Sequence, residues 1–206
     1  MFLRRKPSEE FVRQFIASQQ DLAFSYSEVG ATRSEAPPAK YTVDHNGIKL
    51  GQGQETYQRA ISALGSWQQF ELGWVTLVPP GQPLKVGTTV AVQAKTFGCW
   101  SLNATRVVYV IDEKDSKKAR FGFAYGTLPD HVERGEERFT VEWRADDSVW
   151  YDIYAFSRPK HPLVRLGFPI TRRLQKRFVR DSLAVMKAAV DDLALDYCGP
   201  YESEKL

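Results

Sequence analysis

The sequence changes its hydrophobic period near Glu71, and this change constrains the fold more than any other feature. Before it, apolar residues recur at helical spacing over about residues 54–66, which predicts an amphipathic helix. After it, apolar and polar residues alternate, which is typical of strands. Six strands are predicted, over about residues 71–78, 88–97, 102–112, 120–128, 136–145 and 148–156. The breaks between them are short and rich in turn formers, so neighbouring strands should pair antiparallel.

One long helix is predicted after the last strand, over about residues 169–195. Its predicted apolar stripe consists of Ile170, Leu174, Phe178, Val185, Ala189 and Leu193. Its first half carries a cluster of cations, called the basic ridge: Arg172, Arg173, Lys176, Arg177 and Arg180. At 1.5 Å per residue such a helix is about 40 Å long, which is enough to cover a sheet.

The N-terminal part is predicted to be a helix followed by an irregular arm. The helix begins at Pro7, where acidic residues follow in the first turn, and ends near Gln20. Residues 21–40 contain Gly, Pro, Ser and Thr and should lie over the domain. The predicted anchors of this arm are Phe24, Tyr26 and Val29. We therefore divide the chain into residues 1–40, helix and arm, and residues 41–206, the main domain, within a single globular unit.

A strand is also predicted over residues 41–50, although the turn-forming pair Asn46-Gly47 interrupts it. With the six later strands it gives a seven-stranded sheet. The clearest alternation, over residues 136–144, predicts one wet face and one buried face. The wet face would carry Glu136, Arg138, Thr140 and Glu142. Because the buried face must be covered, the fold class is α+β: a curved seven-stranded antiparallel sheet wraps around the long C-terminal helix.

Composition narrows the function classes. The chain has 206 residues, 43% hydrophobic and 26% charged, as expected of a globular domain rather than a disordered chain. A net charge of +3 is too small to indicate nucleic-acid binding. The two cysteines, Cys99 and Cys198, lie far apart in no metal-like spacing, which favours a reduced compartment, the cytoplasm. We see no signal peptide and no apolar run that could span a membrane.

Two resemblances follow from these segments. The order of elements over residues 41–195 resembles the helix-grip superfamily of the major birch pollen allergen and the steroid-transfer (START) domains. Nearly the whole chain resembles uncharacterised protein family 0548, a domain-of-unknown-function family. The stretches that carry this second resemblance are YTVDHNGIKLGQG, FELGW, GTTVAV, RVVYVID, RFGFAYGTLPDHVERGEERFTVEW and VWYDIYAFSRPKHPL, of which Phe121 to Trp143 is the most specific. This family implies the helix-grip fold and brings no established activity and no catalytic residues.

A ligand cavity between sheet and helix is the leading functional hypothesis, because the resemblance implies a sheet that does not close fully on its helix. The ring-bearing candidates for its lining are Trp74, Tyr109, Phe121, Phe123, Tyr125, Trp143, Tyr151 and Phe178, with Trp150 and Tyr154 beside them. The expected ligand is an apolar or aromatic small molecule or a lipid. No cofactor is expected. The alternative is that these rings fill the core.

A cyclase- or hydrolase-type enzyme is an alternative function, in which His45, His131 or a tyrosine of the cavity would transfer the proton. Glu136 is a further polar candidate, because it lies with Glu133 and Glu137 near His131. His45 follows Asp44 on a strand, so their side chains should point to opposite faces. A surface position for His45 is the alternative. For residues 128–138 (LPDHVERGEER) the alternative is a solvated hairpin loop, and their spacing matches no metal-ligand motif. His161 has less support.

The basic ridge is the strongest charge feature, and most of it falls on one side of the predicted helix. It favours an interaction with anionic lipid or with nucleic-acid phosphates, against the alternative of a solvated outer face. The glycines Gly51 and Gly53 precede a helix, but no Walker lysine follows them, so they do not form a phosphate loop.

Overall fold

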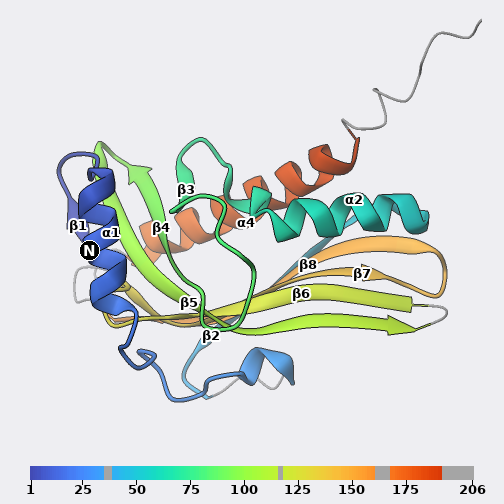
Figure 1. The fold of residues 1–206 in the computed structure, drawn as a ribbon, viewed down its shortest axis with the longest axis horizontal. Helices are drawn as coiled ribbons and strands as arrows, with labels where there is room; N and C mark the ends of the chain where they lie inside the picture. Colours follow the sequence, from blue (N-terminus) through green and yellow to red (C-terminus); the bar gives the residue numbers. More distant parts are fainter. Residues whose placement is uncertain (35–38, 116–117, 161–167, 192–206) are drawn as a thin grey trace, which may run out of the picture.

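The computed structural model describes residues 1–34, 39–115, 118–160 and 168–191. The helices are α1 (Glu9–Gln19), α2 (Gly53–Gly65) and α4 (Phe168–Asp191), with short 3-10 turns η1 (Ala31–Arg33) and η2 (Gln68–Phe70). The strands are β1 (Phe2–Leu3), β2 (Thr42–Gln52), β3 (Val75–Val78), β4 (Thr89–Thr96), β5 (Cys99–Asp115), β6 (Lys118–Thr127), β7 (Glu133–Trp143) and β8 (Ser148–Pro159). In Figure 1, α2 and α4 cover one face of the sheet and the N-terminal arm crosses the other.

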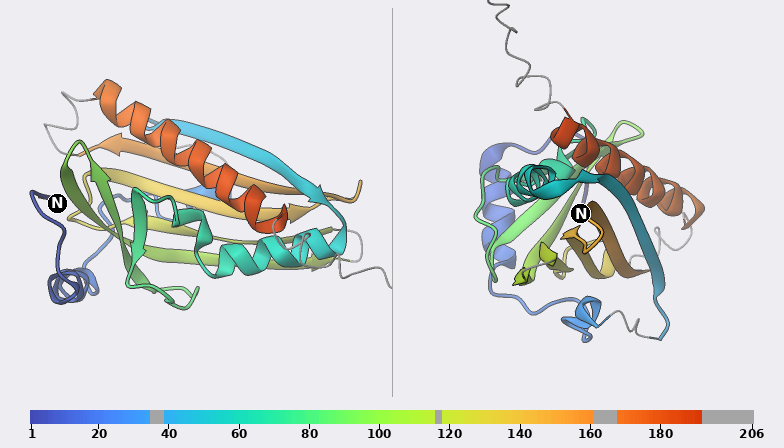
Figure 2. Two further views of the ribbon diagram at one scale, coloured as in Figure 1. Left: turned by 90° about the horizontal axis from the view of Figure 1, so that it is seen from above. Right: turned by 90° about the vertical axis from the view of Figure 1, so that its right-hand side faces the viewer.

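The sheet is antiparallel throughout, and its strand order is β2-β8-β7-β6-β5-β4-β3, with the short β1 paired to the start of β5. Register shifts at Lys49/Gly51 in β2 and at Val107/Tyr109 in β5 insert an extra residue. Such bulges bend a strand and increase its twist. Figure 2 shows the sheet curling around the side on which α4 and α2 lie. The predicted α+β class, the seven strands of the main path and the helix-grip arrangement are confirmed.

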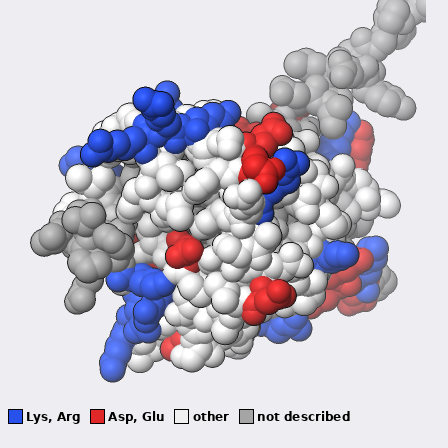
Figure 3. Space-filling view, turned by 60° about the vertical axis from the view of Figure 1, so that its left-hand side comes forward, with Lys and Arg blue, Asp and Glu red and all other residues white. Residues whose placement is uncertain are grey.

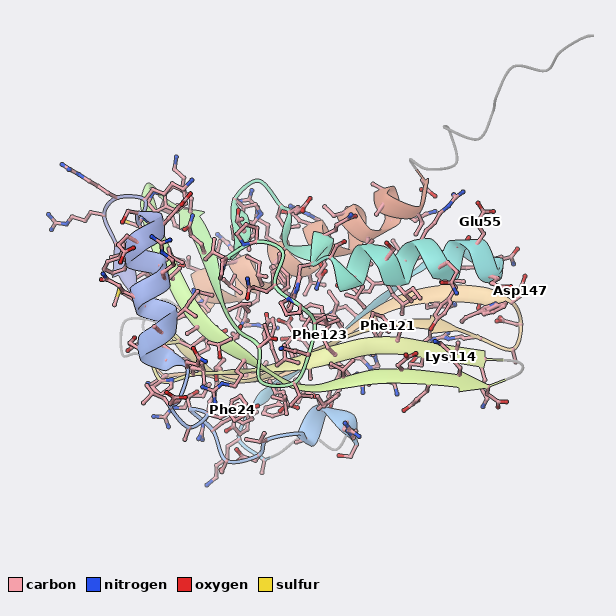
Figure 4. All side chains as sticks on the ribbon, viewed as in Figure 1. Phe24, Glu55, Lys114, Phe121, Phe123 and Asp147 are labelled. Carbon is pink, nitrogen blue, oxygen red and sulfur yellow. The ribbon has the colours of Figure 1, made fainter. Side chains whose placement is uncertain are left out.

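The core lies between the concave inner face of the sheet and the two helices. Ring side chains of Phe70, Phe123 and Phe139 are fully buried there. In Figure 4, Phe121 and Phe123 lie on the helix side of the sheet, and Phe24 of the arm lies on the opposite side.

The core-facing residues of α4 coincide only in part with the predicted stripe, since Phe178 and Ala189 belong to both. Its buried residues are Ser182, Met186 and Val190, flanked by Phe178, Val179, Leu183 and Ala189. Ile170 is 49% exposed, because the first turn of α4 lies at the open end of the sheet rather than over the packed core. Leu193 and the predicted end of the helix at residue 195 lie outside the described residues, as do His161 and Cys198.

The prediction of a turn at Asn46-Gly47 was wrong. β2 runs through this pair, with Asn46 opposite Ile153 and Gly47 opposite Asp152 on β8. A full ladder to a long neighbour satisfies the backbone groups of both residues and outweighs their local turn preference. The break predicted over residues 98–101 is also shorter than expected, since only Phe97 and Gly98 separate β4 from β5.

The prediction of a wet outer face was also wrong. Glu136 and Arg138 are only 2% and 1% exposed, and Thr140 is fully buried. The reason is the arm, which covers this face with Tyr26 and Thr32. The segment from Glu133 onward is therefore a strand rather than a solvated loop.

None of the helices in the described part of the chain is long and apolar enough to cross a membrane.

Candidate functional site

A cavity of about 560 Å³ lies between the inner face of the sheet and the first half of α4. Its walls come from β3, β4, the start of β5, the end of β6, the start of β7 and the end of β8. The helix contributes Ile170, Thr171, Leu174, Gln175, Phe178 and Val179. Most of these walls are apolar, and the acidic residues among the lining come from β2 and β7.

The cavity is open at one end of the sheet because the inner-face residues there are small. Ala94, Ser101, Thr127, Ala155 and Ser157 line it, and none of them reaches far towards α4. At the other end α2 and η2 cover the sheet, and large rings fill the space. The same sheet therefore has a packed half and a hollow half.

The mouth of the cavity carries exposed apolar side chains. Phe97 is 82% exposed, Phe2 54%, and Ile170 also borders the opening. Phe97 occupies a left-handed backbone conformation, with φ of 50°, in the tight turn between β4 and β5. A bulky residue in that conformation is unusual, and such positions are found preferentially at functional sites.

Figure 3 views the molecule from the side of α1: Lys and Arg gather near its edges, and much of the surface between is uncharged.

Inside the cavity, Tyr125 of β6 and Glu137 of β7 form the principal polar pair. They are cross-strand partners, which brings their side chains to the same face. The Tyr125 hydroxyl donates a hydrogen bond of 2.7 Å to Oε2 of Glu137. The pKa of Glu137 is raised to about 7, chiefly by burial and also by the charge of the neighbouring Glu133, while the hydrogen bond from Tyr125 acts in the opposite direction. Burial also raises the pKa of Tyr125 well above its usual value, so its proton stays on the phenol.

A second polar group joins β7 to α4. Gln175 donates hydrogen bonds to Glu133, at 2.7 Å, and to Ser157. Burial raises the pKa of Glu133, while the bond from Gln175 and the charge of Arg172 lower it. Arg172 itself donates two hydrogen bonds, of 2.6 and 2.7 Å, to the carboxylate of Asp44 on β2. These contacts fix the start of α4 over the edge of the sheet.

His131 lines the cavity, but it is not a strong base. Its Nδ1 accepts a hydrogen bond of 3.0 Å from the backbone N–H of Glu133. Burial lowers its pKa to about 3, so the ring is neutral at physiological pH. Among the described residues, no group of three or more His, Cys, Asp and Glu side chains is placed to hold a metal ion.

The other two polar candidates face away from the cavity. His45 bonds Asp152 at 2.6 Å on the outer face, while Asp44 lines the cavity, so the expected opposite orientation of these neighbours is observed. The Glu136 backbone borders the cavity, but the arm binds the Glu136 carboxylate on the outer face. There it accepts hydrogen bonds from the Tyr26 hydroxyl, at 2.6 Å, and from the Thr32 hydroxyl and backbone N–H.

The ring candidates separate into three groups. Those that line the cavity are Trp74, Tyr125 and Phe178. Those that pack in the core beside it are Phe121, Phe123, Trp143 and Tyr151. The remaining three, Tyr109, Trp150 and Tyr154, belong to the outer face, where the Tyr109 hydroxyl bonds Thr32. The rings therefore divide between the hollow half and the packed half of the sheet.

Sequence reasoning missed Gln175 as a site candidate, and it considered Glu137 only among the carboxylates near His131 without singling it out. The signal for Glu137 was present in the sequence, because it shares the strand face of Phe139 and Val141. An acid on an apolar strand face is a stronger functional signal than an acid on a polar one. Gln175 gave no such signal, since polar residues surround it on the helix.

The structure divides the basic ridge into separate contacts. Arg172 pairs with Asp44, whereas Arg177 and Arg180 pair with Asp181. Arg177 also stacks on the ring of Trp74 at 4.4 Å. Arg173 and Lys176 are exposed. A separate hollow of about 460 Å³ between β2 and α4 includes Arg172, Lys176 and Arg180 in its lining. Arg177 and Arg180 are exposed as well, so four of the five ridge cations face solvent, although Asp181 pairs with two of them.

Comparison with known proteins identifies the family. Residues 25–185 match the family described as "Domain of unknown function (DUF1990)". The chain belongs to this family. A UPF0548 protein of Dictyostelium discoideum is 38% identical over 207 residues, which cover 92% of this chain and 96% of the relative. One of Deinococcus radiodurans is 38% identical over 192 residues, covering 87% and 94%. The resemblance to family 0548 is thereby confirmed.

Among solved structures, this DUF1990 member is similar to the hypothetical protein jhp0584 from Helicobacter pylori. The TM-score is 0.48 at 13% sequence identity, and the match covers 81% of this chain and 95% of the other.

Proposed function

We propose that the protein binds an apolar or aromatic small molecule, such as a lipid, in the cavity between the sheet and α4. The observation that carries this proposal is the cavity itself, with a volume of about 560 Å³. Ligand pockets typically occupy about 300–1,000 Å³ and combine apolar walls with a few polar groups. The rings of Trp74 and Phe178 and the Tyr125–Glu137 pair supply both elements.

The packing around the cavity supports a binding role. Protein interiors are close-packed, and voids larger than a water molecule are few. Here the core rings pack together beside a hollow whose sheet wall includes several small side chains. The exposed Phe97 and Phe2 at the mouth would give an apolar ligand a continuous path from solvent.

Native mass spectrometry of the full chain purified from its own host tests the proposal. We expect a co-purifying small molecule with the wild type and with Arg173→Trp, whose side chain is exposed and lines neither hollow. Leu174→Trp, which fills the cavity from the adjacent position, should abolish the bound mass. Equal retention by both variants would place the ligand elsewhere, and absence of any ligand from the wild type would oppose the proposal.

An acid–base enzyme is the second candidate, and Glu137 favours it. A carboxyl group whose pKa is near 7 can both take and give a proton at physiological pH. It would replace His45 and His131 in that role, since the first lies on the outer face and the second is neutral. Incubating the molecule recovered by mass spectrometry with the wild type should then convert it to a product of different mass or retention time. Glu137→Gln should slow this conversion by about 100-fold; an equal rate in both would exclude Glu137 as the proton-transfer group.

A further inference from the structure

Three carboxylates face the cavity, and they differ in their partners. Asp44 has the two hydrogen bonds from the Arg172 guanidinium. Glu133 accepts a hydrogen bond from Gln175. Glu137 accepts one from the Tyr125 phenol at Oε2, and within the described part of the chain its Oε1 has no partner and no cationic side chain pairs with it.

Glu137 is also reachable from the cavity. Its carboxyl group lies deep in the protein, but the side chain is not fully enclosed. Its remaining accessible surface faces the cavity. An ionised carboxylate in such surroundings is costly unless a cation pairs with it. Burial and the nearby Glu133 accordingly raise the pKa of Glu137 to about 7.

We propose that the cavity selects apolar molecules that carry a protonated amine, with the Glu137 carboxylate binding the ammonium group at its free Oε1. This inference rests on the proposed function, because it names the ligand class of the same cavity. Tyr125 orients the carboxylate through its hydrogen bond to Oε2, and the rings of Trp74 and Phe178 contact the apolar body. An anionic ligand would meet two acidic groups, Glu133 and Glu137, and should be disfavoured.

Three probes that share one apolar body test this selection: 1-naphthylmethylamine, 1-naphthylmethanol and 1-naphthoic acid. Their affinities for the full chain are measured by calorimetry at pH 8 and pH 5.5, on the wild type, Glu137→Gln and Glu142→Gln. Glu142 is the matched control, since it lies on the same strand but on the outer face, paired with Arg120 and Arg144. Circular dichroism verifies that each variant is folded.

At pH 8 we expect the wild type to bind the amine at least about tenfold more tightly than the alcohol, and the naphthoate most weakly. Glu137→Gln should remove the preference for the amine, whereas Glu142→Gln should keep it. At pH 5.5 the preference should shrink, because Glu137 is then mostly protonated. If the alcohol or the naphthoate binds as tightly as the amine, or if Glu137→Gln keeps the preference, the amine inference fails while the proposed function stands. If none of the three probes binds, the amine inference and the proposed function both fail.

Discussion

Glu136 and Glu137 are neighbours on β7, yet they lie in opposite environments. The Glu136 carboxylate faces outward under the arm and accepts hydrogen bonds from Tyr26, Gly30 and Thr32. The Glu137 carboxylate faces inward, accepts one hydrogen bond and borders a hollow. A buried carboxylate whose oxygens all accept hydrogen bonds connects the segments that donate them. A buried carboxylate with a free oxygen is available to a ligand. The outer-face network therefore connects the arm to the sheet, and the inner face carries the candidate site.

The largest effect should come from breaking the outer network. Glu136→Ala leaves the buried hydroxyls of Tyr26 and Thr32 without their acceptor. We expect the free energy of unfolding, measured with urea, to fall by about 3–5 kcal/mol. Glu142→Ala on the same face removes partly exposed ion pairs and should cost less than about 1 kcal/mol. Equal losses in the two variants would contradict a stabilising role for the arm contacts.

Replacing the inner acid, Glu137, should raise stability rather than lower it, and the size of this effect should depend on pH. The pKa of Glu137 is about 7 in the folded protein and near its ordinary value of 4.5 in the unfolded chain. The folded state therefore binds more protons between these values, and stability falls as pH rises from about 4.5 to 7, by about 2–3 kcal/mol. Glu137→Gln lacks this loss, so its stability relative to the wild type should increase over that range. A difference that stays constant with pH would oppose the burial of Glu137.

Two tyrosines that pack edge-on against Phe156 sharpen the comparison on the outer face. Tyr26 donates to the buried Glu136, and Tyr41 donates to the partly exposed Glu28. Tyr26→Phe should lower the free energy of unfolding by about 2 kcal/mol, because a hydrogen bond to a buried charge is lost. Tyr41→Phe should lower it by less than about 1 kcal/mol. Urea unfolding of the two variants in parallel measures the difference, and a reversed order would be inconsistent with the burial of the network.

The smallest effect is expected at Tyr125. Tyr125→Phe removes the single donor to Glu137 and should lower the free energy of unfolding at pH 5.5 by about 1 kcal/mol or less. At that pH Glu137 is mostly protonated and does not need the donor. Thermal unfolding followed by circular dichroism is sufficient to measure this loss of stability. A loss as large as that of Tyr26→Phe would mean that the inner pair is structural too.

The sequence was enough to predict the sheet, its antiparallel order and the helix that it grips, since these follow from periodicity and turn composition. It was not enough to predict the arm's role. The alternation at residues 136–144 distinguishes two strand faces, but it does not reveal that residues 26–32, which are about 100 positions away, will cover the polar one. Such long-range coverage leaves no periodic signal in either segment.

The candidate site was predicted in position but only partly in composition. Most of the ring candidates alternate along strands, and alternation alone does not separate rings that line a cavity from rings that fill the core. Which of them pack as core depends on where α2 and η2 lie over the sheet, and that is a tertiary property. Phe123 packs against Trp67 at 4.7 Å, for example, whereas Tyr125, two residues later on the same face, borders the hollow.

The pH titration of the Glu137 carboxyl carbon, followed by ¹³C NMR on the full chain, tests most directly whether the sheet encloses an apolar, ligand-accessible hollow. If the carboxylate is enclosed and has no cation beside it, the titration midpoint should lie near pH 7. Adding 1-naphthylmethylamine should move this midpoint to lower pH. A midpoint near 4.5 that the amine leaves unchanged would show a well-solvated acid and contradict the account.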